Sequence, residues 1–148
     1  MPIIVDIDNA TVNAWVPTQA AFEEWVTLAL QNHSPAEISI RIVDESESAH
    51  LNLTYRGKTG ATNVLSFPAD IPEVVQSDLL GDLVICATVL AAEAVTQGKP
   101  LQAQWAHITI HGVLHLLGYD HINDDDAAVM EQLEINLLKQ LGYDNPYL

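Results

Sequence analysis

The sequence predicts an α+β fold in which a small mixed β-sheet is packed by helices, one of them a central helix that carries histidines. Two patterns support this fold class. Short runs rich in β-branched residues have the alternation of strands, and longer segments place apolar residues at helical spacing. Strand-like segments and helices joined by several short connections favour the α+β class. We expect residues 1–148 to form a single domain, because this length suits one hydrophobic core and no repeat or boundary stands out.

Four segments are predicted to be strands. The clearest places Ile38, Ile40 and Ile42 on one face of an alternating pattern. Another is almost entirely apolar and contains Cys86, which we interpret as a core residue rather than a nucleophile or a metal ligand. The predicted strands span residues 3–7, 37–43, 63–67 and 79–86, and residues 69–78 form a polar connection between the last two.

Five segments are predicted to be helices. The central one is apolar on most sides, which indicates a buried core helix. The last one begins with three aspartates, which suit the positive end of a helix dipole better than they suit a second metal site. Its apolar stripe consists of Met130, Leu133, Leu137 and Leu141. The predicted helices span residues 17–30, 44–55, 88–97, a central segment from residue 100 or 101 to the turn at Gly118, and 124–141.

The composition limits the classes of protein that the chain can be. No apolar run approaches the 18 residues of a membrane span. The first residues do not have the pattern of a secretion signal. The single cysteine cannot form an intrachain disulfide. We therefore expect a cytoplasmic protein without a membrane contact. The net charge of −15 repels nucleic acid at long range. Arg56 and Lys58 form the only close basic pair, so a polyanion should bind there.

Three histidines within eleven residues can converge on one point. His111 and His115 are four residues apart, so on a helix they lie on the same face, one turn apart. Gly118 occupies a position where helices commonly end, and the chain can then turn back and bring His121 toward that face. Three imidazoles with a fourth position left to water are typical of a catalytic zinc site.

A rival triad would combine His107 with His111 and His115. In a helix, His107 and His115 would lie roughly 12 Å apart along the axis, too far for two ligands of one ion with Zn–N bonds of about 2.0–2.1 Å. We therefore interpret His107 as a packed residue or as a partner of a ligand. Imidazoles also suit nickel, copper and iron, so the sequence does not fix the metal.

The spacing is similar to the His-Glu-x-x-His pattern of zinc proteases, with one departure. Gly112 stands where those enzymes have the glutamate that serves as general base. This substitution disfavours peptide hydrolysis by that route, and the sequence identifies no other general base.

Several motifs together resemble those of the YbeY family of bacterial endoribonucleases and rRNA maturation factors. The resemblance covers most of the chain, from about Ile38 to Tyr147. The motifs are His111-Gly112-x-x-His115-Leu116-x-Gly118-Tyr119-Asp120-His121, Leu51-Asn52-x-x-Tyr55-Arg56, Thr62-Asn63-Val64-Leu65-Ser66-Phe67-Pro68, Leu80-Gly81-Asp82-Leu83-Val84-Ile85 and Gly142-Tyr143.

The resemblance implies a zincin-like fold, related to that of zinc proteases, and one zinc ion bound by His111, His115 and His121. It also implies that Arg56 is required for ribonuclease activity, and we assign Arg56 and His111 as catalytic residues. A guanidinium can fork onto phosphate oxygens, so we expect Arg56 to orient the scissile phosphate. The alternative for Arg56 is a surface salt bridge with one of the twenty acidic residues.

The function implied by the resemblance is cleavage of single-stranded RNA in 3′-end maturation of 16S rRNA, with a further part in late ribosome quality control. The implied partners are ribosomal RNA and the small ribosomal subunit, a small-subunit ribosomal protein and an assembly GTPase, but not DNA. Two alternatives stay open: a zinc hydrolase of another substrate class, and a non-catalytic assembly factor with a structural metal. Asn63 and Ser66 are candidates to line the cleft, and Asp120 is either a partner of a ligand or a turn residue.

Overall fold

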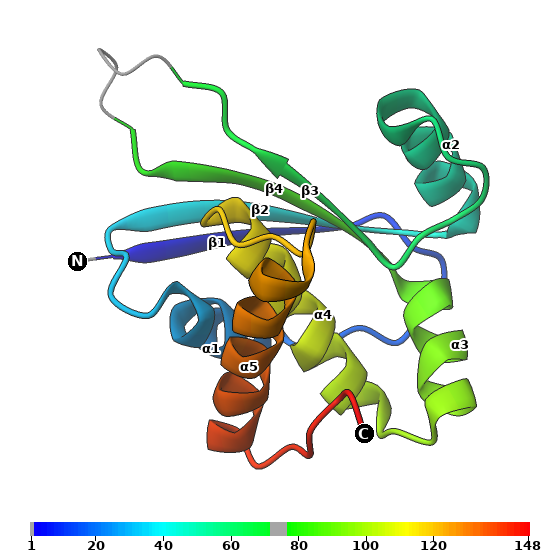
Figure 1. The fold of residues 1–148 in the computed structure, drawn as a ribbon. Coiled ribbons are helices and arrows are strands. Elements are labelled where there is room, and N and C mark those ends of the chain that lie inside the picture. Colours follow the sequence, from blue (N-terminus) through cyan, green and yellow to red (C-terminus); the bar gives the residue numbers. More distant parts are fainter. Residues whose placement is uncertain (1, 72–76) are drawn as a thin grey trace.

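The computed structural model describes residues 2–71 and 77–148, which form one four-stranded sheet and five helices (Figure 1). This arrangement confirms the predicted α+β class. Part of the predicted polar connection, residues 72–76, lies outside the described residues. The elements are β1 (Ile3–Asn9), α1 (Gln19–Leu30), β2 (Ala36–Val43), α2 (Glu45–Arg56), β3 (Val64–Pro68), β4 (Leu79–Cys86), α3 (Ala87–Gln97), α4 (Leu101–Leu116) and α5 (Asp124–Gln140).

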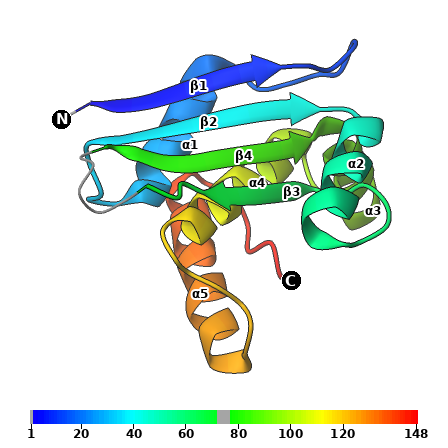
Figure 2. The same cartoon turned by 90° about the horizontal axis from the view of Figure 1, so that it is seen from above.

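The sheet is mixed, as the sequence predicts. Its strand order is β1-β2-β4-β3, with β1, β2 and β4 parallel and β3 antiparallel to β4 at one edge. Figure 2 shows the four strands in this order, with β3 at the edge nearest the end of α4. The edge strand β3 therefore lies between the rest of the sheet and the part of the chain that carries the histidines.

One face of the sheet packs on helices. The alternating isoleucines of β2 are at most 1% exposed, which confirms the buried face predicted for this strand. Helices α1 and α4 cover that face, and α5 packs on α4 farther from the sheet (Figure 1). Phe22 of α1 meets Trp105 of α4 edge to face, with ring centroids 5.9 Å apart. Aromatic burial of this kind is a major source of stability in a small core.

The helix boundaries follow from local capping. The predicted first helix begins at Gln19 instead of residue 17, because the Thr18 side chain caps it by accepting a hydrogen bond from the Ala21 amide at 3.1 Å. The Asn123 side chain caps α5 in the same way, through the Asp126 amide at 2.9 Å. The three aspartates of α5 are exposed in its first turn, which agrees with their interpretation as dipole-compatible residues.

Helix α4 is the central core helix, since it packs against α1, α3, α5, β3 and β4. Gly112 lies where α4 approaches the sheet most closely. A Cβ at this position would be 2.9 Å from Leu83 Cδ2 of β4 and 3.4 Å from Val64 Cγ2 of β3. Gly112, which stands where zinc proteases have their glutamate, is therefore buried against the sheet. A side chain at this position would point to β4 and β3 and not to the histidine cluster. No helix of the described residues is long and apolar enough to cross a membrane.

Gly81 of β4 lies close to the backbone of the neighbouring strand β3. Its φ is +150°, and a Cβ there would lie 2.3 Å from the Phe67 carbonyl oxygen of β3. Because that oxygen belongs to the backbone, it cannot move away without displacing the edge strand. The glycine is thus required by the pairing that holds β3 beside α4.

We predict that Gly81→Ala lowers the free energy of unfolding by about 3 kcal/mol or more, because backbone strain and overpacking each cost about 1–3 kcal/mol. Gly60→Ala is the matched control, since Gly60 also has positive φ but has open space around it. We expect the control to cost about 1–2 kcal/mol. Chemical denaturation measures both values, and equal losses would show that the contact with β3 is unimportant.

Candidate metal centre and adjoining cavity

The end of α4 has the hydrogen bonds of a Schellman turn. The Tyr119 amide donates to the Leu114 carbonyl at 3.0 Å, and the Gly118 amide donates to the His115 carbonyl at 3.0 Å. Gly118 has a φ of +102°, which favours glycine. The turn confirms the predicted helix end and directs the chain back toward His121.

The three predicted ligands come together. One nitrogen from each of His111, His115 and His121 can be chosen so that all three lie within 4.8 Å of one another. The ring centroids are 4.6 Å apart for His111 and His115, 5.0 Å for His115 and His121, and 5.7 Å for His111 and His121. Two rings come from one face of α4, and the third comes from the segment after the turn.

The hydrogen-bond partners of two rings determine their tautomers. His111 Nδ1 lies 2.5 Å from Glu134 Oε1, and His115 Nδ1 lies 3.1 Å from the Tyr119 carbonyl oxygen. A carbonyl oxygen and a carboxylate only accept hydrogen bonds, so both Nδ1 atoms carry the proton. Each Nε2 of a neutral ring is then a bare acceptor.

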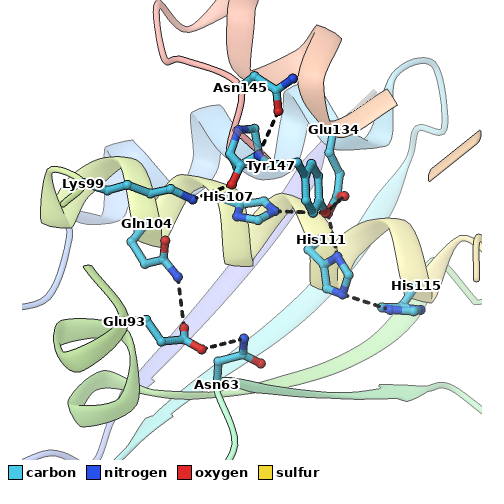
Figure 3. A network of polar contacts seen from close by, with 11 residues as sticks. Asn63, Glu93, Lys99, Gln104, His107, His111, His115, Glu134, Asn145 and Tyr147 are labelled. Atoms are coloured by element: carbon cyan, nitrogen blue, oxygen red, sulfur yellow. Dashed lines mark hydrogen bonds and ion pairs between the residues drawn. The ribbon is translucent and has the colours of Figure 1, made fainter. Parts of the chain in front are cut away.

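The two bare Nε2 atoms lie only 3.1 Å apart (Figure 3). Two lone pairs at this distance repel each other unless a proton or a metal cation lies between them. Burial, together with the neighbouring His111 and His121, lowers the pKa of His115 and so favours its neutral form. Neutral imidazoles with free Nε2 atoms are the form that binds divalent metals, so the cluster fits such an ion.

A second group that could hold a cation consists of His107, His111 and Glu134. Glu134 of α5 is fully buried. Burial by itself raises the pKa of its carboxyl, but hydrogen bonds from His107, His111 and Tyr147 lower this pKa to about 2. The carboxylate is therefore ionised at neutral pH, and it lies at the side of the His111 ring away from His115.

A cavity of about 480 Å³ adjoins the three histidines. Arg56 reaches it from the end of α2, where Gly57 closes the helix in a left-handed conformation. Asn63 and Ser66 line it, as proposed from the sequence. The other lining residues are Thr62, Val64, His111, His115, His121, Ala127, Met130, Glu131, Glu134 and Tyr147.

The structure also shows the surroundings of several polar residues that the sequence left open. Within the described part of the chain, no acidic group lies within salt-bridge distance of Arg56. His107 is 3.5 Å from Glu134 and does not belong to the three-histidine group, as the helix geometry predicts. Asp120 accepts a hydrogen bond from the His121 amide at 2.7 Å, a contact within the turn. Cys86 is buried in the core.

Two residues near the centre were not predicted from the sequence. Glu134 and Tyr147 form a polar network with His107 and His111 (Figure 3). A signal for Glu134 was present, because it follows Met130 by four residues and precedes Leu137 by three, which places an acid within the apolar stripe of α5. Tyr147 lies beyond the last helix, where no periodicity places a side chain.

A second polar network supports the cavity wall near β3. Gln104, 2% exposed, donates to Glu93 Oε1 at 3.0 Å, and Asn63 donates to Glu93 Oε2 at 3.4 Å (Figure 3). The Asn63 side-chain oxygen also accepts from the Val64 amide at 2.7 Å. Asn63 is thus fixed between α3 and the start of β3.

Comparison with known proteins gives concordant matches. The model of the family described as Endoribonuclease YbeY matches residues 6–142. A curated protein named Endoribonuclease YbeY from Methylococcus capsulatus is 57% identical over 145 residues, which cover 98% of this chain and 95% of the relative. A protein from Thermotoga maritima, solved in solution, has a TM-score of 0.64 at 21% identity, over 93% of this chain and 89% of its own. This last likeness shows the fold alone.

Proposed function

Because this chain belongs to the YbeY endoribonuclease family, we propose that it is a zinc-dependent endoribonuclease that cleaves single-stranded RNA at the cavity beside the three histidines. Membership shows a nuclease family with RNA as substrate class. The observation that carries the metal dependence is the pair of bare Nε2 atoms of His111 and His115 at 3.1 Å, with His121 beside them.

In this proposal, His111, His115 and His121 hold the ion and leave a fourth position toward the cavity. A zinc ion bound there would supply Lewis-acid chemistry, by polarising a phosphoryl oxygen and activating water. Among the three ligands, His111 is the one whose orientation is fixed by a charged partner, Glu134. This contact supports the assignment of His111 to the catalytic machinery as well as to the metal site.

Arg56 is proposed to bind the scissile phosphate. Its guanidinium is permanently charged and can donate two parallel hydrogen bonds to phosphate oxygens. Two other basic residues already have partners: Arg41 bonds to Asp8 and Glu47, and Lys99 bonds to the Pro146 carbonyl. Lys139 lies in the last turn of α5, outside the cavity lining. Arg56 lines the cavity and has no ion-pair partner among the described residues, so in this proposal it binds a phosphate and stabilises charge that develops there during cleavage.

The RNA that we propose as substrate is the 3′ region of precursor 16S rRNA, processed on the small ribosomal subunit in the cytoplasm, with a further part in late ribosome quality control. The net charge of −15 supports a need for recruitment, since so acidic a chain gains little from long-range attraction to RNA. Contacts with a small-subunit ribosomal protein and an assembly GTPase would supply that recruitment.

We predict that the purified protein binds one zinc ion per chain, and that His115→Ala weakens zinc binding at least 100-fold. Removal of one of three ligands leaves an incomplete coordination shell. His50→Ala is the control, because His50 is an exposed histidine of α2 outside the cluster. Metal analysis and competition with a chromogenic chelator measure both variants, and normal zinc binding by His115→Ala would contradict the ligand set.

The His115→Ala variant also separates an enzyme from a non-catalytic assembly factor. If the metal serves catalysis, cells that carry only this variant accumulate precursor 16S rRNA even where the variant protein is folded and abundant. Normal rRNA processing in such cells, combined with a lowered melting temperature, would contradict the enzymatic role and favour a structural metal.

We predict that Arg56→Ala lowers cleavage of precursor 16S RNA about 100-fold without loss of zinc, because it removes a donor to transition-state charge. Lys139→Ala removes the same unit charge from α5, outside the cavity lining, and should stay within about threefold of the parent. A gel-based cleavage assay at fixed salt gives both rates. Equal activity of Arg56→Ala and the parent on RNA, or cleavage of a small chromogenic phosphoester in preference to RNA, would reject the proposed substrate class.

A further inference from the structure

We infer that Glu134 and Tyr147 are positioning residues of the metal centre: Glu134 fixes the tautomer and ring orientation of His111, and Tyr147 fixes the Glu134 carboxylate. This inference rests on the proposed function, because it assigns roles toward the ion that the three histidines are proposed to bind. Neither residue was predicted from the sequence, and neither has a role in the cleavage chemistry proposed above.

The first observation is the burial of a charge. Among the described residues that are buried, Glu134 is the one with an ionisable acidic or basic side chain, and its exposure is 0%. It lies in the apolar stripe of α5, next to Met130 and near Leu137 and Leu138. A buried carboxylate is unfavourable unless it is fully hydrogen-bonded, so its presence here requires specific partners.

Both oxygens of Glu134 have such partners. Oε1 accepts from His111 Nδ1 at 2.5 Å, with His107 Nε2 3.5 Å away, and Oε2 accepts from the Tyr147 hydroxyl (Figure 3). Burial and the contact with Glu134 raise the pKa of Tyr147, so its phenol keeps the proton that it donates. The carboxylate is held between α4 and the C-terminal segment.

The role of Glu134 follows from which nitrogen of the His111 ring it contacts. It bonds to the Nδ1 side of His111, whereas the Nε2 side faces His115 and the candidate metal position. A charged acceptor on Nδ1 keeps the proton there, leaves Nε2 free and raises the basicity of the ring. His115 receives a weaker, neutral partner in the Tyr119 carbonyl. Glu134 thus acts on one ligand only.

Direct ligation by Glu134 is the competing interpretation, since Glu134, His107 and His111 also form a group that could hold a cation. The separation of 2.5 Å between His111 Nδ1 and Glu134 Oε1 is that of a short hydrogen bond. Two atoms each bound to zinc at about 2.0–2.1 Å in tetrahedral geometry lie roughly 3.3 Å apart. The contact therefore favours a proton between the two atoms over an ion.

The C-terminal segment is itself held in place. Lys99 Nζ, in the connection between α3 and α4, donates to the Pro146 carbonyl at 2.9 Å, and the Tyr147 amide donates to Asn145 Oδ1 at 2.8 Å. The Tyr147 ring packs edge to face against His107, with centroids 5.5 Å apart. These contacts hold the hydroxyl of Tyr147 against Glu134, which links residues 145–147 to the metal centre.

The test measures zinc affinity by chelator competition in Glu134→Gln, Tyr147→Phe and the matched control Glu131→Gln. Glu131 lies on the same helix and lines the same cavity, but it has no hydrogen bond to a histidine. We expect Glu134→Gln to weaken zinc binding 10- to 100-fold and Tyr147→Phe to weaken it by a smaller factor of about 3–10. Glu131→Gln should stay within about threefold of the parent, because it removes a charge that makes no hydrogen bond to a ligand.

A second readout is the visible absorption of the cobalt-substituted protein, which reports ligand geometry without reference to RNA cleavage. We expect altered bands in Glu134→Gln and unaltered bands in Glu131→Gln, with the metal-free melting temperatures as a check on folding. If Glu134→Gln and Glu131→Gln weaken zinc binding equally, the effect comes from the loss of a negative charge alone, and the inference is overturned. Parent-like affinity in both Glu134→Gln and Tyr147→Phe would do the same.

The same measurements distinguish this inference from the proposed function. A parent protein that binds no zinc or cobalt would contradict the proposed metal centre itself. A parent that binds metal, with variants that bind it equally well, would contradict the positioning roles alone. If Glu134→Gln does not fold, Tyr147→Phe decides the matter, since it keeps the carboxylate and removes one of its hydrogen bonds.

Discussion

The approach of His111 Nε2 to His115 Nε2, at 3.1 Å, constrains the chemistry of this protein more than any other contact, because in neutral rings with protonated Nδ1 atoms both Nε2 atoms are acceptors. Two acceptors held so close are unfavourable until a cation lies between them. The protein tolerates the arrangement because each ring is fixed from its other side, by Glu134 and by the Tyr119 carbonyl. Contacts that fix ligand rings from outside the cluster lower the entropic cost of binding an ion there.

The fold supplies the rigidity that this arrangement needs. Helix α4 is packed on one side by the sheet and α1 and on the other by α5, so its two histidines cannot move apart without disturbing the core. Gly112 permits the close approach of α4 to β3 and β4, and Gly81 permits β3 to pair closely with β4. The edge strand in turn contributes Val64 and Ser66 to the cavity lining, and the end of α2 contributes Arg56.

The sequence predicted the elements of the fold well because their signals are local. Alternation in β2, the apolar length of β4 and the glycine after α4 each depend on a few neighbouring residues, and the three histidines were grouped from spacing and one turn. The strand order could not be derived in this way, because pairing of β4 between β2 and β3 depends on contacts distant in sequence.

Glu134 and Tyr147 were not predicted for the same reason as the strand order, because their contacts join residues that are distant in sequence. Glu134 is 23 residues from His111, and Tyr147 is 13 residues from Glu134. Nothing in the spacing of the histidines indicates such partners, since the contacts arise only when α5 packs on α4 and Tyr147 contacts both helices. An acid within an apolar helical stripe was the one available indication, and it identifies a buried charge without identifying its partner.

The three-histidine centre can be tested by a crystal structure of the zinc-loaded protein with anomalous scattering data at the zinc edge. We expect one anomalous peak, at a bonding distance of about 2.0–2.1 Å from a nitrogen of each of His111, His115 and His121, with no fourth protein atom bound. A peak between His107, His111 and Glu134, or an ion enclosed by four protein ligands, would contradict it.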